Sequence, residues 1–119
     1  MRVKDAVGRF GEDLAARHLG AAGMTILQRN WRCPAGELDI VAEDPGVLVF
    51  VEVKTRSSLS FGDPAEAVNA AKAARLRRLA LIWLADHSDQ YWPQLRFDVV
   101  AVLRLAPGGP LVRHLRGAF

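Results

Sequence analysis

The residues best placed to do chemistry are Asp39, Glu52 and Lys54, which interrupt two neighbouring apolar segments of the chain. The pattern predicts a β-hairpin whose strands, Glu37–Glu43 and Val47–Thr55, are joined by a short turn that contains Pro and Gly. Because side chains alternate between the two faces of a strand, Glu52 and Lys54 continue a face that is otherwise apolar. A buried charge is costly unless it is paired or bound to a metal. Two carboxylates and a lysine at the end of a buried hairpin therefore predict a divalent-metal site with an amine beside it.

A structural interpretation of the same three residues stays open at this point. Glu52 and Lys54 could form an ordinary ion pair between residues two apart at a strand end, and Asp39 could be a solvated residue before the turn. The hairpin pattern alone favours neither interpretation, so the other segments of the chain must decide between them.

The bulk composition indicates one globular domain that spans residues 1–119. Hydrophobic residues make up 50% of the chain and charged residues 24%, which is typical of globular proteins. No apolar run approaches the roughly 20 residues that span a bilayer, and the N-terminus lacks the apolar segment of a signal peptide, so we expect no membrane partner. The single cysteine, Cys33, excludes an internal disulfide and a cysteine-based zinc site, which favours a cytoplasmic location.

The charge distribution favours a polyanionic partner. The formal net charge is +3, and four of the 16 Lys and Arg residues fall between residues 72 and 78. Such a basic cluster is consistent with nucleic-acid binding, although many basic proteins bind no polyanion.

An amphipathic helix is predicted over residues 4–22, where apolar residues recur at three- and four-residue spacing. Gly8 and Gly11 lie on or beside the apolar stripe and lower its helix propensity, which usually indicates the close approach of another element. Glu12 lies at the border of the stripe, from where it could reach a site at the edge of the core. Alternatively, Glu12 and Asp13 only complement the helix dipole.

A second helix is predicted from Pro64 to about Asp86, because Asp63 and Glu66 form a capping box at its start. Lys72 lies within the apolar stripe of this helix, so its side chain either points over the sheet towards the carboxylates or extends to solvent. Arg75 borders the same face.

Three further arginines could contact phosphate or could simply be solvated. Arg77 and Arg78 point to other faces of the second helix, and Arg56 lies in the polar loop that precedes it.

Strands are also predicted at Met24–Arg32, Gln94–Leu105 and Leu111–Leu115. A helix crosses between the hairpin and Gln94–Leu105, so these strands should be parallel within a mixed sheet. The expected fold class is α/β, with the order α-β-β-β-α-β and a short C-terminal strand. Asp98 has no assigned role, and the three histidines are expected to be structural or at the surface.

The order of elements and the spacing Asp39-x12-Glu52-x-Lys54 resemble the PD-(D/E)XK nuclease superfamily, whose restriction-endonuclease-like fold has a three-layer α-β-α core. More narrowly, nearly the whole chain resembles the YraN family of small bacterial endonuclease-like proteins. The matching motifs are G-x-x-G-E-D-x-A-A at 8–16, N-W-R at 30–32, G-E-L-D-I-V at 36–41, V-F-V-E-V-K-T-R at 49–56 and F-G-x-P-x-E-A-V at 61–68. One departure is Leu38, which stands where the superfamily has Pro before the motif Asp.

The resemblance implies roles for the core residues. Asp39, Glu52 and the backbone carbonyl of Val53 would bind Mg²⁺ or Mn²⁺, with water in the open positions. Lys54 would orient the attacking water or neutralise the charge that develops on the phosphate.

Four further residues receive supporting roles. Glu12 would be an accessory ligand through water, by a weaker resemblance to archaeal Holliday-junction resolvases. Glu37 is a candidate for the outer shell of the metal site. Lys72 and Arg75 would touch phosphate.

The implied activity is metal-dependent hydrolysis of phosphodiester bonds in DNA, in repair, recombination or processing. Because no DNA-reading domain is appended, we expect recognition of DNA structure rather than sequence. The alternatives are a non-catalytic nucleic-acid-binding module and a subunit that depends on a protein partner. A homodimer is compatible with the cutting of two strands, but no feature of the sequence establishes one.

Overall fold

The computed structural model describes residues 3–56, 69–104 and 108–119. The helices and strands follow in the order α1 (Val3–Ala21), β1 (Thr25–Cys33), β2 (Gly36–Asp44), β3 (Val47–Arg56), α2 (Ala70–Asp86), β4 (Gln94–Leu103) and β5 (Leu111–Leu115). This order confirms the predicted α-β-β-β-α-β succession with a short C-terminal strand. Neither described helix is long and apolar enough to cross a bilayer.

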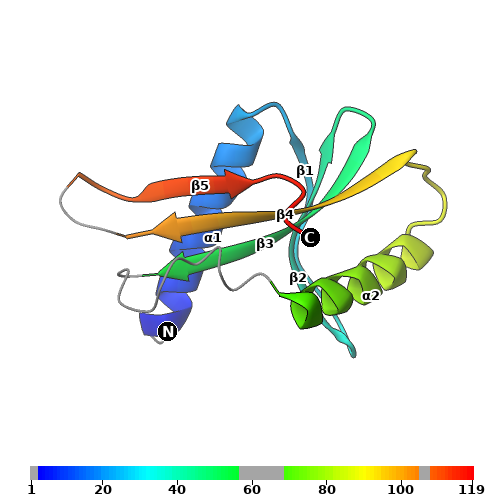
Figure 1. Ribbon diagram of the computed structural model, residues 1–119, viewed down its shortest axis with the longest axis horizontal. Helices are drawn as coiled ribbons and strands as arrows, with labels where there is room; N and C mark the ends of the chain where they lie inside the picture. Colours follow the sequence, from blue (N-terminus) through cyan, green and yellow to red (C-terminus); the bar gives the residue numbers. More distant parts are fainter. Residues whose placement is uncertain (1–2, 57–68, 105–107) are drawn as a thin grey trace.

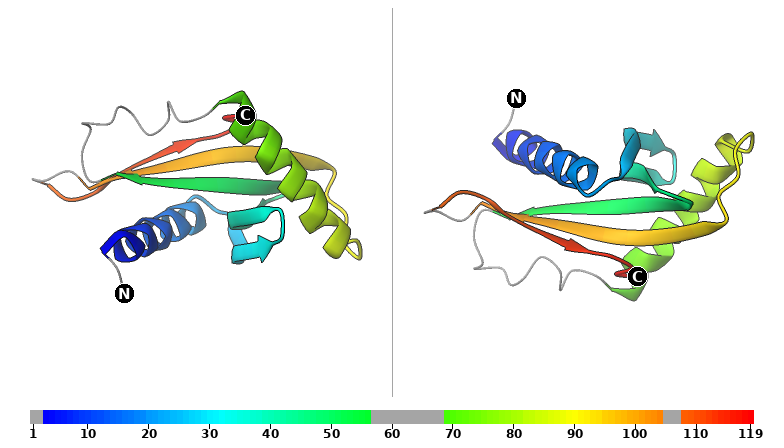
Figure 2. Two further views of the ribbon diagram at one scale, coloured as in Figure 1. Left: turned by 90° about the horizontal axis from the view of Figure 1, so that it is seen from below. Right: turned by 90° about the horizontal axis from the view of Figure 1, so that it is seen from above.

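The five strands form one mixed sheet in the order β1-β2-β3-β4-β5 (Figure 1). Strands β1, β2 and β3 form an antiparallel meander, β3 and β4 are parallel, and β5 is antiparallel to β4. Helix α1 lies against one face of the sheet, and α2 begins on the opposite side (Figure 2). The arrangement has three α-β-α layers, in agreement with the expected fold class.

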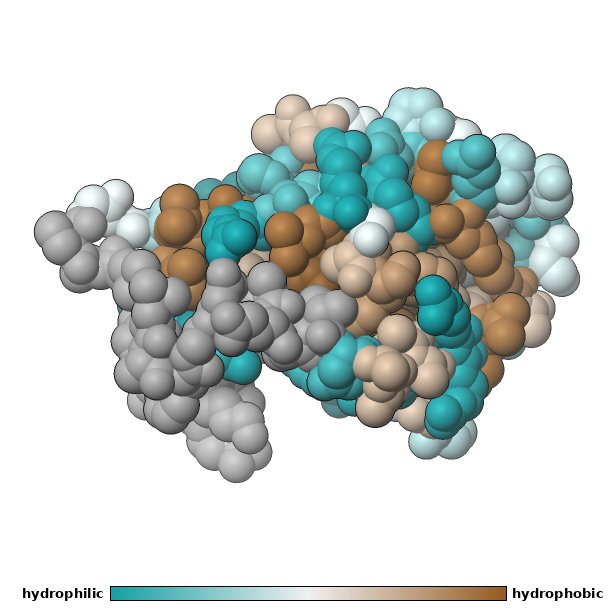
Figure 3. Space-filling view, in the orientation of Figure 1, coloured by the Kyte–Doolittle hydropathy of each residue, from teal (hydrophilic) through white to brown (hydrophobic). Residues whose placement is uncertain are grey.

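Strand β3 contributes to a separate apolar cluster on each face of the sheet, as its alternation predicts. Val49 and Val51 pack with Ala15 and Leu19 of α1. On the other face, Leu48 and Phe50 belong to the cluster that contains the buried side chains of α2, which are Leu76, Leu79, Ala80 and Trp83. Apolar side chains of this second cluster reach the surface between β4 and α2 (Figure 3).

Helix α1 approaches β3 most closely at Gly11. A Cβ atom at this position would overlap the side-chain oxygen of Thr55. A Cβ atom at Gly8, one turn earlier, would meet no atom within 4 Å. The close approach of another element, which the glycines predict, is therefore confirmed at Gly11. It brings the next residue of α1, Glu12, to the end of β3.

Helix α2 begins at Ala70 and not at Pro64. Asn69 has an extended backbone (φ −146°, ψ 171°), and its side-chain oxygen accepts a hydrogen bond from Lys72 N at 3.0 Å. The prediction of one continuous helix from Pro64 is therefore wrong, because Asn69 is the N-cap of α2. The expected capping box of Asp63 and Glu66 lies outside the described residues.

A buried carboxylate ties the C-terminal segment to the sheet. Asp98 is fully buried, and it accepts hydrogen bonds from Arg96 (2.8 and 3.0 Å) and from Gly117 N (2.9 Å). The Nε2 atom of His114 lies 2.8 Å from the same carboxylate. Arg96 also bonds to Asp44 at the turn between β2 and β3, at 3.2 Å. Asp98 therefore has a structural role that the sequence analysis did not assign, and His114 is structural as expected.

Gly11→Ala is expected to lower the free energy of unfolding by about 1–3 kcal/mol, because the new methyl group meets Thr55 in a packed contact. Gly8→Ala is the matched control in the same helix. It is expected to raise the free energy of unfolding by up to about 1 kcal/mol through helix propensity alone. Urea denaturation measures both changes. A stabilising effect at both positions would contradict the close contact.

Asp98→Asn is expected to lower the free energy of unfolding by about 3 kcal/mol, because it removes the buried carboxylate of the Arg96 ion pair and leaves that guanidinium with Asp44 alone. Burial alone would raise the pKa of Asp98, but the hydrogen bonds from Arg96, Gly117 and His114 lower it below the ordinary 3.8. This stabilisation is therefore complete above pH 3.8 and is lost as the pH falls through the lowered pKa.

Urea denaturation as a function of pH tests this expectation, with Asp86→Asn as a control at an exposed carboxylate. The wild type and Asp86→Asn should lose stability in acid, and Asp98→Asn should show a smaller loss. Equal acid sensitivity in all three proteins would contradict the role of Asp98.

Candidate active site

The predicted metal site lies where β2 separates from β3. The antiparallel pairing of these strands runs from Asp44↔Val47 to Ile40↔Val51 and ends there. The next pair in this register would be Asp39 with Glu52. Instead, Val53 N donates a hydrogen bond to the Asp39 carboxylate (Oδ2, 2.9 Å), so a side chain replaces the backbone pairing.

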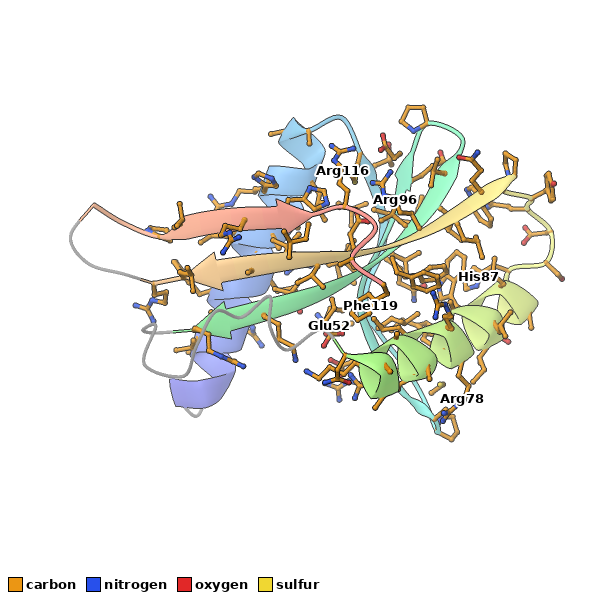
Figure 4. All side chains as sticks on the ribbon, in the orientation of Figure 1. Glu52, Arg78, His87, Arg96, Arg116 and Phe119 are labelled. Atoms are coloured by element: carbon orange, nitrogen blue, oxygen red, sulfur yellow. The ribbon has the colours of Figure 1, made fainter. Side chains whose placement is uncertain are left out.

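Glu52 is buried beside two cations. Its side chain is 8% exposed, and its Oε1 atom lies 3.2 Å from Lys54 Nζ and 3.7 Å from an Arg75 Nη atom. Figure 4 shows Glu52 between β3 and the first turn of α2. The ion pair that the structural interpretation foresaw is thus present, but it lies next to the Asp39 carboxylate.

The charge of Glu52 destabilises the ionised form of Asp39. Burial, together with the negative charge of Glu52, raises the pKa of Asp39 to about 7, and the hydrogen bond from Val53 N opposes this shift. The charges of Glu12 and Glu37 contribute in the same direction as Glu52. The site therefore concentrates negative charge where solvent screens it poorly.

Lys72 lies next to Lys54. The pKa of Lys72 is lowered to about 8, first through its contact with Lys54 and then through burial, while the charge of Glu52 opposes the shift. The side chain of Lys72 is thus directed towards the carboxylates, which is the orientation that the sequence left open. Lys54, Lys72 and Arg75 together surround one side of Glu52.

The two other acidic candidates are bound by strand β1. Glu12 Oε1 accepts hydrogen bonds from Arg29 Nε (3.0 Å) and from Asn30 Nδ2 (2.8 Å). Glu37 forms an ion pair with the exposed Arg32 at 2.7 Å. Both lie near enough to influence the pKa of Asp39, but neither has a direct contact with Asp39 or Glu52 in the described structure.

The three remaining basic candidates do not join this group. Arg56 Nη1 lies 3.4 Å from the carbonyl oxygen of Thr55. Arg77 lies over the ring of Phe97, at 5.7 Å from its centroid. Arg78 is exposed and lies away from Glu52 (Figure 4).

The donor atoms at the site fit Mg²⁺ or Mn²⁺. Asp39 and Glu52 supply hard carboxylate oxygens, and no hydrogen bond from the described residues reaches Asp39 Oδ1 or Glu52 Oε2. Within residues 3–56, 69–104 and 108–119, no group of three or more His, Cys, Asp or Glu side chains could hold a metal ion by itself. Two carboxylates with a carbonyl and several waters suit Mg²⁺, which retains much of its hydration.

One residue beside the site has a backbone that the sequence analysis did not foresee. Asn30 has φ = 54° within β1, and no other non-glycine residue of the described structure has a positive φ. Asn tolerates this conformation better than most residues, and Asn30 is also the first residue of the N-W-R motif, but neither signal indicates its contact with Glu12.

Comparison with known proteins identifies the family. The model of the family described as "Uncharacterised protein family UPF0102" matches residues 11–102. The chain belongs to the UPF0102 family. This match includes Glu12, Asp39, Glu52 and Lys54, and it confirms the resemblance to YraN proteins.

Relatives within UPF0102 are similar over their full lengths. A UPF0102 protein of Beutenbergia cavernae is 61% identical over 98% of both chains. One from Frankia casuarinae is 59% identical over 100% of both chains. Another, from Streptomyces griseus, is 54% identical over 98% of both chains.

Asp39→Asn is expected to raise the free energy of unfolding by about 1–3 kcal/mol in metal-free buffer near pH 8. The variant removes a disfavoured negative charge, and its amide oxygen can still accept the bond from Val53 N. In the wild type, the folded pKa of about 7 exceeds the ordinary 3.8, so stability falls as the pH rises between these values.

Thermal denaturation with and without Mg²⁺ completes this test. Mg²⁺ should raise the melting temperature of the wild type and of Asp86→Asn, a control at an exposed carboxylate outside the site, but not that of Asp39→Asn. A destabilised Asp39→Asn that responds to Mg²⁺ like the wild type would contradict the assignment of Asp39.

Proposed function

We propose that this UPF0102 protein is a Mg²⁺- or Mn²⁺-dependent endonuclease of the PD-(D/E)XK superfamily that hydrolyses phosphodiester bonds in DNA. The observation that carries the proposal is the convergence of Asp39, Glu52 and Lys54 where β2 separates from β3. An isolated ion pair between Glu52 and Lys54 would not require a second carboxylate in the same buried place. A divalent cation would relieve the repulsion between the two carboxylates.

Asp39, Glu52 and the carbonyl oxygen of Val53 would hold the ion. The ion, when bound, would polarise the scissile phosphate and lower the pKa of a coordinated water. Asp39 is fixed for this role by the hydrogen bond from Val53 N. Glu52 is fixed by burial and by its ion pair with Lys54.

Lys54 would act on the reacting groups themselves. Its ammonium lies 3.2 Å from Glu52, so it is directed at the site without being a ligand. In that position it can orient the attacking water or neutralise negative charge that develops on the phosphate.

Two cations of α2 would bind the substrate backbone. Lys72 lies beside Lys54, and Arg75, whose side chain is about half exposed, lies 3.7 Å from Glu52. Cations at the rim of a carboxylate site can engage the phosphates that flank the scissile bond. Contacts of this kind carry no sequence information, so we propose that the enzyme recognises DNA structure, in repair, recombination or processing.

A cleavage assay tests the proposal. The purified chain is incubated with labelled single-stranded, duplex, flap and four-way-junction DNA in Mg²⁺, Mn²⁺ or EDTA. Cleavage of at least one structure is expected in metal and not in EDTA. Asp39→Asn and Lys54→Ala should each lower the rate about 100-fold or more.

Arg116→Ala is the matched control. It also removes a cation that pairs with a carboxylate, here Asp44 at 3.2 Å, but it lies outside the site. It should therefore cleave like the wild type. Binding without metal-dependent cleavage would contradict the proposed activity and would favour a nucleic-acid-binding module or a partner-dependent subunit.

A further inference from the structure

Asn30 departs from strand geometry directly opposite Asp39. The pairing of β1 with β2 joins Arg29 to Ile40 and Trp31 to Leu38, which places Asn30 opposite Asp39 between these two pairs. The left-handed backbone of Asn30 (φ = 54°) interrupts the regular strand at this level. Unfavourable backbone conformations of this kind persist where the surrounding structure holds them, and they often occur at functional sites.

The departure allows two consecutive residues to bind one carboxylate oxygen. In a regular strand, the side chains of Arg29 and Asn30 would point to opposite faces. Here both donate to Glu12 Oε1 on α1, at 3.0 and 2.8 Å. Within the described residues, no donor reaches Glu12 Oε2.

Glu12 lies close to the proposed metal site, and the packing of the adjacent residue holds it there. The adjacent Gly11 lies against Thr55 at the end of β3. The Glu12 side chain is only 12% exposed, and its charge contributes to the electrostatic environment of Asp39. Because Asn30 donates to only one oxygen, it fixes the carboxylate while Oε2 stays available as an acceptor.

We propose that Asn30 is a positioning residue, which fixes Glu12 so that the second carboxylate oxygen accepts a hydrogen bond from water bound to the metal ion. This inference rests on the proposed function, since it requires a divalent cation at Asp39 and Glu52. Residues that orient the surroundings of a metal ion typically alter its affinity when they are replaced.

The test is the affinity for Mn²⁺ of the metal-stripped protein, measured by calorimetry. Asn30→Gly keeps the left-handed backbone accessible but removes the carboxamide. It should weaken Mn²⁺ binding on the order of 10-fold, as Glu12→Gln should. The double variant should bind no more weakly than Glu12→Gln alone, because Asn30 acts through Glu12.

Two further variants separate this role from a general effect on β1. Thr25→Gly places glycine at an exposed position of the same strand and should bind Mn²⁺ like the wild type. Asn30→Ser keeps the side chain polar and uncharged but is too short to replace the carboxamide donor to Glu12, so it should weaken binding about as much as Asn30→Gly.

The outcomes distinguish the two proposals. If Asp39→Asn abolishes Mn²⁺ binding but Asn30→Gly and Asn30→Ser leave it unchanged, the role of Asn30 is wrong and the proposed function stands. An additional loss from Asn30→Gly in the Glu12→Gln background would also overturn the role, because Asn30 would then act independently of Glu12. If the wild type binds no Mn²⁺ through Asp39, both proposals fail.

Discussion

The hydrogen bond from Val53 N to the Asp39 carboxylate determines how the centre of this molecule is built. The backbone pairing of β2 and β3 ends at Ile40 and Val51, which would leave the next amide without a partner. Burial of an unpaired amide is unfavourable, and Asp39 satisfies it with a side chain. The same contact fixes Asp39 close to Glu52, so one interaction both completes the sheet and creates a pair of neighbouring carboxylates.

Such a pair can persist only because the rest of the fold stabilises it. Burial and the charge of Glu52 raise the pKa of Asp39, and Lys54 and Arg75 offset part of the negative charge. The apolar clusters on both faces of β3 hold the strands in register. On β4, Asp98 ties the strand, the turn after β2 and the C-terminal segment together through Arg96 and Gly117. Locally unfavourable interactions that are balanced by packing elsewhere are typical of functional sites.

The sequence predicts most of the fold and the centre of the site, because these depend on local patterns. Alternation along β3 places Glu52 and Lys54 on one face, and the crossover through α2 requires β3 and β4 to be parallel. Features that depend on distant contacts are not predictable in this way. Examples are the N-cap of α2 at Asn69, the burial of Asp98 against His114, and the contact of Asn30 with Glu12. Each requires knowledge of which segments meet in three dimensions.

The most direct test of the metal site is a crystal structure of the protein with Mn²⁺, in which anomalous scattering locates the ion. We expect an anomalous peak coordinated by Asp39, Glu52 and the carbonyl oxygen of Val53, with the amide of Val53 still bonded to Asp39. The absence of a peak there at a saturating Mn²⁺ concentration, or a peak only at other carboxylates, would contradict it.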